Sequence, residues 1–141
     1  MMDERVQTRG IRVMHVEDHA GFRVLIKNLL NSQSDMEVVA QAASLDEARA
    51  RVAGSEIDVT VLDLSLPDGN GLDLIPELRQ ANPDVGVLIL SANLDPAGPE
   101  RAPDAGADEI LDKLAPVEEV VDSVRKLGIR NYESGFDWEV V

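Results

Sequence analysis

Short apolar segments alternate with helical patterns along this 141-residue chain, and most of the apolar segments end at a polar residue. Apolar runs of four to eight residues that alternate with helices predict parallel strands joined by crossover helices. The runs that we expect to form strands are 11–16, 36–40, 59–64, 85–90 and 108–112. The sequence therefore predicts an α/β domain with a doubly wound, five-stranded parallel sheet.

Polar side chains stand where four of these strands end. Glu17 and Asp18 follow the first run, Asp63 falls at the end of the third, and Ser91 follows the fourth. Lys113 follows the fifth run. Because all strands of a parallel sheet bring their carboxyl ends to one edge, we expect these side chains to converge. The sequence thus predicts a small pocket that contains three acids, a hydroxyl and an ammonium group.

Two crossovers are expected to depart from regular helices. Pro76 lies inside the helical pattern that follows the PDGNG turn (67–71), which predicts a delayed or distorted first turn. The fourth crossover contains Pro96, Pro99 and Pro103. Each proline inside a helix costs about 3 kcal/mol, so we expect a short or irregular element there.

The composition excludes several classes of function. The formal net charge is −14, from 27 acidic and 13 basic residues, which disfavours direct binding of nucleic acid or an anionic membrane. The chain has no cysteine, which excludes disulfides and thiolate metal sites. No apolar run approaches the ~20 residues that span a bilayer, and the start of the chain lacks a signal-peptide core. We expect a cytoplasmic protein.

The two ends are expected to lie outside the domain. Residues 1–10 are polar and predict a flexible arm, residues 11–127 form the domain, and residues 128–141 form a tail. The tail contains three of the four aromatic residues of the chain, Tyr132, Phe136 and Trp138. It is either a partly disordered end or a segment that packs on its own domain, on a second copy in a homodimer, or on a partner.

The ordered set of pocket residues resembles the receiver domain of response regulators in two-component signalling, over about residues 11–127. The resemblance rests on Glu17-Asp18, Asp63 followed by LSLPDGNG, Ser91, and Lys113 behind Gly106-Ala107-Asp108. It implies a flavodoxin-like sheet with the strand order 2-1-3-4-5. It also implies that a sensor histidine kinase or a histidine phosphotransfer protein supplies a phosphoryl group from phosphohistidine.

The resemblance assigns a role to each residue of the pocket. Asp63 would be the phosphoacceptor, and Asp18 and Asp63 would bind Mg²⁺ directly. Glu17 would act through a water molecule, and the backbone carbonyl of Ser65 would supply another oxygen. Few carboxylates with retained water and phosphate oxygens suit Mg²⁺.

Two further residues would contact the phosphoryl group. Lys113 would pair with Asp63 at rest and with the phosphoryl group afterwards, and the Ser91 hydroxyl would hydrogen-bond a phosphoryl oxygen. Such charge neutralisation and positioning accelerate phosphoryl transfer. By contrast, we expect His15 to be a packed core residue and His19 to lie at the rim of the pocket.

The chain departs from the family pattern in the part that usually carries the output. Ile110 stands where a switch aromatic is usual, and Leu114 stands where proline is usual after the lysine. The fourth crossover, normally a helix of the output surface, is rich in proline. We hypothesise that the aromatic tail covers the face of the fourth crossover, last strand and last helix.

Three functions remain as alternatives. The leading one is a stand-alone receiver that switches a protein-binding surface, with at most self-phosphorylation and self-dephosphorylation activity. The second is the receiver half of a DNA-binding transcription regulator. The third is a Mg²⁺-dependent phosphohydrolase with an aspartyl-phosphate intermediate. Such enzymes need an acid two residues after the nucleophile, and Ser65 occupies that position.

Overall fold

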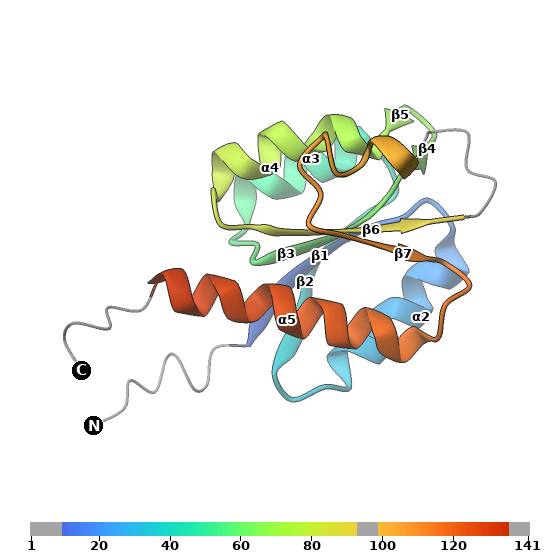
Figure 1. Cartoon of the computed structure of the whole chain (residues 1–141). Helices are drawn as coiled ribbons and strands as arrows, with labels where there is room; N and C mark the ends of the chain where they lie inside the picture. The colour runs from blue at the N-terminus through green and yellow to red at the C-terminus, as the bar shows by residue number, and fades with distance from the viewer. Residues whose placement is uncertain (1–9, 93–98, 136–141) are drawn as a thin grey trace, which may run out of the picture.

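Five parallel strands form the central sheet in the order β2-β1-β3-β6-β7 (Figure 1). The computed structural model describes residues 10–92 and 99–135. The strands are β1 (Ile11–Val16), β2 (Met36–Ala42), β3 (Val59–Asp63), β6 (Gly86–Ser91) and β7 (Glu109–Asp112). Because β6 and β7 are the fourth and fifth strands of this sheet, the predicted order 2-1-3-4-5 is confirmed.

Helices cover both faces of the sheet (Figure 1). Helices α2 (Ala20–Asn31) and α5 (Val117–Gly135) lie on one face, and α3 (Leu45–Gly54) and α4 (Ile75–Ala81) on the other. Strand β3 is buried along its whole length: Val61 joins the core under α2 and α5, whereas Leu62 joins the core under α3 and α4. A strand covered on both sides has no solvent-facing side, which explains the continuous apolar run in the sequence.

Helix α5 is longer than the sequence predicts. Val120, Val121, Val124 and Leu127 of this helix are buried. The helix does not end there but continues to Gly135, so the predicted boundary at residue 128 falls inside it. A glycine permits this path, because a Cβ atom at Gly128 would lie 2.5 Å from the Ile11 side chain.

Nearly all of the predicted arm and the last six residues of the predicted tail lie outside the described part of the chain. Residues 1–9 and 136–141 belong to this group, and the side chain of Tyr132 is not described either. The packing proposed for the aromatic tail therefore stays a prediction.

The segment after β3 contains two features. A short hairpin of β4 (Ser65–Leu66) and β5 (Gly69–Asn70), which the sequence analysis did not predict, surrounds the expected turn. A 3₁₀ helix, η1 (Gly71–Leu74), then precedes α4. Helix α4 begins at Ile75, so Pro76 lies in its first turn. Backbone N–H groups of the first turn have no partner within the helix, so the missing N–H of proline costs no hydrogen bond there. The predicted distorted start is confirmed.

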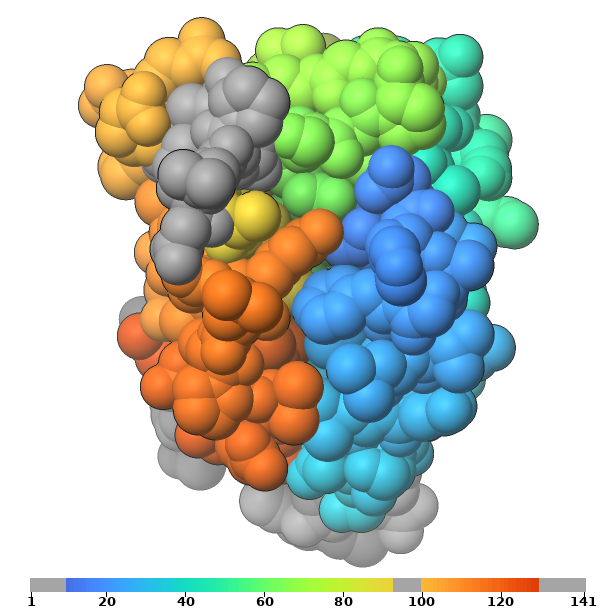
Figure 2. Space-filling model, turned by 90° about the vertical axis from the view of Figure 1, so that its right-hand side faces the viewer, coloured from blue at the N-terminus to red at the C-terminus, as the bar shows by residue number. Residues whose placement is uncertain are grey.

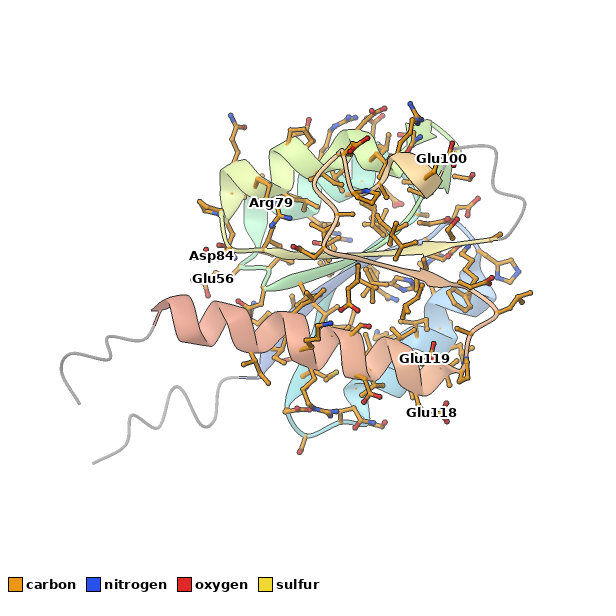
Figure 3. All side chains as sticks on the ribbon, viewed as in Figure 1. Glu56, Arg79, Asp84, Glu100, Glu118 and Glu119 are labelled. Carbon is orange, nitrogen blue, oxygen red and sulfur yellow. The ribbon has the colours of Figure 1, made fainter. Side chains whose placement is uncertain are left out.

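The fourth crossover is irregular in its described part, as predicted. Its element there is a 3₁₀ helix, η2 (Pro99–Arg101), and residues 93–98 lie outside the described chain. Arg79 of α4 (Figure 3) contacts the segment that leads from the fourth crossover into β7. Its guanidinium donates to the carbonyls of Val85 and Gly106, the latter at 2.6 Å, and lies 3.1 Å from Asp108 Oδ2.

Much of the acidic charge lies on the surface. Figure 3 labels five exposed acids, Glu56, Asp84, Glu100, Glu118 and Glu119. In the described part of the chain, no helix is long and apolar enough to cross a membrane.

Candidate functional site

The carboxyl edge of the sheet brings together the residues that the sequence placed at the strand ends. Asp63 ends β3, Ser91 ends β6, Glu17 directly follows β1 and Lys113 directly follows β7. Figure 2 looks onto this edge, where blue, green, yellow and orange segments meet. The parallel topology therefore does what the strand-end pattern predicts, because it assembles residues from four distant segments.

Three carboxylates form the centre of the site. One carboxylate oxygen from each of Glu17, Asp18 and Asp63 lies within 4.8 Å of the others. Glu17 and Asp63 are 1% and 4% exposed, whereas Asp18 is exposed to solvent. Clustered carboxylate oxygens with one side open to water match what Mg²⁺ requires, so these residues fit the predicted ion.

Lys113 supplies the positive charge of the site. Its Nζ atom lies 2.8 Å from Glu17 Oε1 and 3.1 Å from Asp63 Oδ2. The other oxygen of Glu17, Oε2, accepts a hydrogen bond of 3.1 Å from the His19 backbone N–H. Both carboxylate oxygens of Glu17 therefore have protein partners.

The ionisation of Asp63 reflects its surroundings. Burial and the neighbouring charge of Glu17 raise the pKa of Asp63 from 3.8 to about 6, against the opposing effect of Lys113 and of a hydrogen bond from the Ser65 N–H. The single positive charge of Lys113 is therefore not enough to offset burial and the charge of Glu17 at Asp63. A divalent cation would favour the ionised form of Asp63.

Ser91 and Ser65 flank the phosphoacceptor candidate. Asp63 pairs with Leu90 across the sheet, so the buried Ser91 lies one residue beyond that pair. The Ser91 hydroxyl donates to its neighbour, the carbonyl of Ala92, at 3.2 Å. The Ser65 backbone N–H donates to Asp63 Oδ1 at 3.3 Å.

The turn after β3 packs directly on the backbone of Asp63. The N–H of Gly71 donates to the carbonyl of Leu64 at 2.8 Å, and Asn70 Oδ1 caps η1. A Cβ atom at Gly71 would lie 2.1 Å from the carbonyl oxygen of Asp63, a distance that no side chain permits. Glycine at this position therefore determines how closely η1 approaches Asp63.

The same turn is anchored to α3. The carboxylate of Asp68 accepts hydrogen bonds from the backbone N–H groups of Leu45 (2.8 Å) and Asp46 (3.0 Å), which lowers the pKa of Asp68. Ser44 also caps this helix, through a bond of 3.2 Å from the Glu47 N–H. Local sequence patterns did not show the role of Asp68, because its partner helix lies more than twenty positions away.

The start of α2 contains two residues whose roles the sequence did not show. His19, not Asp18, caps the helix: its Nδ1 accepts a bond of 3.0 Å from the Phe22 N–H. Arg23 donates to the carbonyls of Glu17 (2.8 Å) and Asp18 (3.2 Å) and so holds the acid pair in place. The only signal was their position, within one helical turn of the acid pair.

The family departures lie near the site without entering the acid cluster. Ile110 and Leu114 are exposed, Leu114 to 83%. No peptide bond within the described ranges is cis, including the one that precedes Leu114. His15 is buried, as expected of a core residue.

Comparison with known proteins agrees with this geometry. The profile of the response regulator receiver domain matches residues 13–125. The response regulator protein VraR of Staphylococcus aureus is 34% identical over 131 residues, which are 93% of this chain and 62% of that relative. This chain therefore spans less than two thirds of the length of that relative.

Solved structures show the same fold. A LuxR-family two-component response regulator from Aurantimonas has a TM-score of 0.76 and 28% identity, covering 85% of this chain and 86% of that one. A response regulator from Burkholderia pseudomallei, solved with a phosphorylated aspartic acid and a calcium ion, has a TM-score of 0.72 and 25% identity, covering 88% and 72%. Since the family profile covers most of the chain, the protein belongs to the response regulator receiver domain family.

Proposed function

We propose that this chain is a phosphoacceptor, which takes a phosphoryl group from a phosphohistidine onto Asp63. The donor would be a sensor histidine kinase or a histidine phosphotransfer protein. The observation that carries the proposal is the contact of Lys113 Nζ with both Asp63 and Glu17, inside a cluster of three carboxylates. Such a site can neutralise an anionic nucleophile and an anionic substrate together.

Asp18 and Asp63 would hold Mg²⁺ directly, Glu17 would act through water, and the carbonyl of Ser65 would complete the protein ligands. The chemistry that Mg²⁺ supplies at such a site is charge neutralisation between the carboxylate and the phosphoryl oxygens. Arg23 keeps the acid pair in position through the carbonyls of Glu17 and Asp18.

The transfer step exchanges one bond to phosphorus for another. A carboxylate oxygen of Asp63 forms the new O–P bond while the N–P bond of the phosphohistidine breaks. The electron pair of that bond returns to the imidazole nitrogen, and the product is an acyl phosphate. The ammonium group of Lys113 then moves from the carboxylate to a phosphoryl oxygen. The Ser91 hydroxyl gives up its hydrogen bond to the Ala92 carbonyl and donates to another phosphoryl oxygen.

Phosphorylation would shift the balance between two conformations and alter a protein-binding surface. Receiver domains of this family are signalling domains, and we propose that this one has at most self-phosphorylation and self-dephosphorylation activity. The phosphohydrolase alternative is weaker, because Ser65 and not an acid stands two residues after Asp63.

Beryllofluoride tests the proposal, since it mimics an acyl phosphate. Wild-type protein should bind it only with Mg²⁺ present, and Asp63→Asn should abolish the binding. Asp104→Asn, which removes an exposed acid of the fourth crossover, is the matched control and should bind normally. Binding that is independent of Mg²⁺ or of Asp63 would contradict the proposal.

A second candidate is that the chain acts as the receiver of a longer DNA-binding regulator. Two observations favour it: the similarity to a LuxR-family regulator and the 62% coverage of VraR. The length of the natural open reading frame distinguishes this from a stand-alone receiver. With a net charge of −14, this chain would not contact DNA directly. In such a regulator, another part of the longer protein would make that contact.

A further inference from the structure

The ammonium group of Lys113 contacts acids at the ends of two other strands, β1 and β3. Lys113 follows the edge strand β7, and β6 and β3 separate that strand from β1, after which Glu17 lies. Nζ nevertheless lies 2.8 Å from Glu17. A lysine side chain held across such a span loses considerable rotamer entropy. Its ion pairs with Glu17 and Asp63 offset part of that loss, and contacts on the α2 side of the pocket add to them.

Phe22 provides an uncharged contact on that side. Nζ of Lys113 lies 5.4 Å from the centroid of the Phe22 ring, within the range of a cation–π interaction. The other two partners of Nζ, Asp63 and Glu17, are carboxylates, and phosphorylation converts the first into an acyl phosphate. Phosphorylation changes neither Glu17 nor the ring, and the ring is the uncharged one of these two constant partners.

Two contacts hold Phe22, one through its backbone and one through its ring. Its backbone N–H donates to Nδ1 of His19, the cap of α2. The ring of the buried His15 packs against it edge to face, with centroids 6.2 Å apart and an angle of 63°. Burial, with the positive charges of Lys113 and Arg23, lowers the pKa of His15 to about 3, so this ring packs as a neutral aromatic.

We propose that Phe22 is a positioning residue for Lys113, whose ring holds the ammonium group in the pocket during phosphoryl transfer. This role rests on the proposed function of Asp63. A leucine would fill much of the same volume but would lack the ring quadrupole that attracts a cation. A packing role and a positioning role therefore predict different results for Phe22→Leu.

The first experiment compares Phe22→Leu and Phe22→Tyr in single-turnover phosphorylation by acetyl phosphate with Mg²⁺. The leucine variant should be slower by about threefold or more, as expected from the strength of cation–π contacts, while tyrosine, which keeps the ring, should restore most of the rate. Thermal unfolding should show that the leucine variant is folded. Equal rates for wild type and a folded leucine variant would overturn the proposal.

The second experiment is a double-mutant cycle with Lys113→Met. In that background, Phe22→Leu should cause no further loss of rate, because the cation that the ring positions is absent. An equal loss in both backgrounds would show that Phe22 acts through packing alone, which contradicts the proposal.

A third measurement separates this inference from the proposed function. In metal-free protein, NMR should show a ring-current shift of the Lys113 side-chain protons next to Nζ, which Phe22→Leu removes and Phe22→Tyr retains. A shift that leucine leaves unchanged would refute the contact whatever Asp63 does. If the contact is present but the wild type accepts no phosphoryl group, the proposed function fails, and the role of Phe22 in transfer fails with it.

Discussion

Nζ of Lys113 lies 3.1 Å from Oδ2 of Asp63, although fifty positions separate the two residues in the chain. Burial alone lowers the pKa of Lys113, but the hydrogen bond with Glu17 and the charges of Asp63 and Glu17 outweigh that effect and raise it. Lys113 is therefore a cation at neutral pH, and its charge favours the ionised form of Asp63.

Removing this charge should make Asp63 harder to ionise. In Lys113→Met, the pKa of Asp63 should rise above its value of about 6, since Lys113 acts to lower it. Carbon-13 NMR of the Asp63 carboxyl group in metal-free protein measures this titration. Lys126→Met removes an exposed lysine that pairs with Glu109, and it should leave the titration unchanged. A midpoint that is the same in all three proteins would contradict the coupling.

The raised pKa of Asp63 predicts how stability depends on pH. The folded state binds this proton more tightly than the unfolded state, in which the pKa is near 3.8. The contribution of Asp63 to stability therefore falls as the pH rises from about 4 through 6, and it stays low above that range. In metal-free Asp63→Asn, this part of the decline in melting temperature should disappear.

Asp104→Asn removes an exposed acid and is the control for that pH series. It should keep the wild-type decline. Added Mg²⁺ should raise the melting temperature of wild type and of the control at pH 7.5, but not that of Asp63→Asn. If melting temperature depends on pH in the same way in all three proteins, Asp63 does not cause the decline, which would contradict the prediction.

Gly71 and Gly54 form a matched pair for testing the turn after β3. A Cβ atom at Gly71 would meet the carbonyl of Asp63 at 2.1 Å, whereas one at Gly54 would have nothing within 4 Å. Gly71→Ala should destabilise the protein by about 2 kcal/mol or more and impair phosphorylation, because η1 and Asp63 must move apart. Gly54→Ala should be neutral or slightly stabilising. Urea unfolding of both variants checks this, and equal stabilities would refute the close contact.

Thr60 offers a stability gain away from the site. This residue of β3 is fully buried, and its hydroxyl has no hydrogen-bond partner within the described part of the chain. Thr60→Val replaces the hydroxyl by a methyl group and should raise the free energy of unfolding by about 1 kcal/mol. Thr60→Ser, which keeps the hydroxyl and loses a methyl, should lower it. A destabilised valine variant would mean that the hydroxyl is hydrogen-bonded.

The sequence predicted the sheet well because strand residues carry their own pattern. A run such as VTVLD in β3 must be apolar when helices cover both faces, and the parallel order then places Asp63, Ser91 and Lys113 at one edge. The strand-end residues could therefore be selected from the chain alone. The chemical roles of these residues are proposals, which the experiments described above test.

Contacts between distant segments account for part of what the sequence did not show. The absence of a side chain at Gly128 lets α5 lie close to Ile11, and the second cap of α3 comes from Asp68. The first cap of α2 is His19, although aspartate is the more common capping residue. With His19 in that role, the Asp18 carboxylate joins the acid cluster instead.

The most direct test of the phosphoacceptor is the site of covalent phosphorylation. Wild-type protein, Asp63→Asn and Asp104→Asn would be incubated with acetyl phosphate, with Mg²⁺ or with EDTA, and analysed as intact proteins and peptides by mass spectrometry. We expect one phosphoryl group, carried by Asp63 and formed only with Mg²⁺, in the wild type and in Asp104→Asn. A phosphoryl group on another residue, or none in the wild type with Mg²⁺, would contradict it.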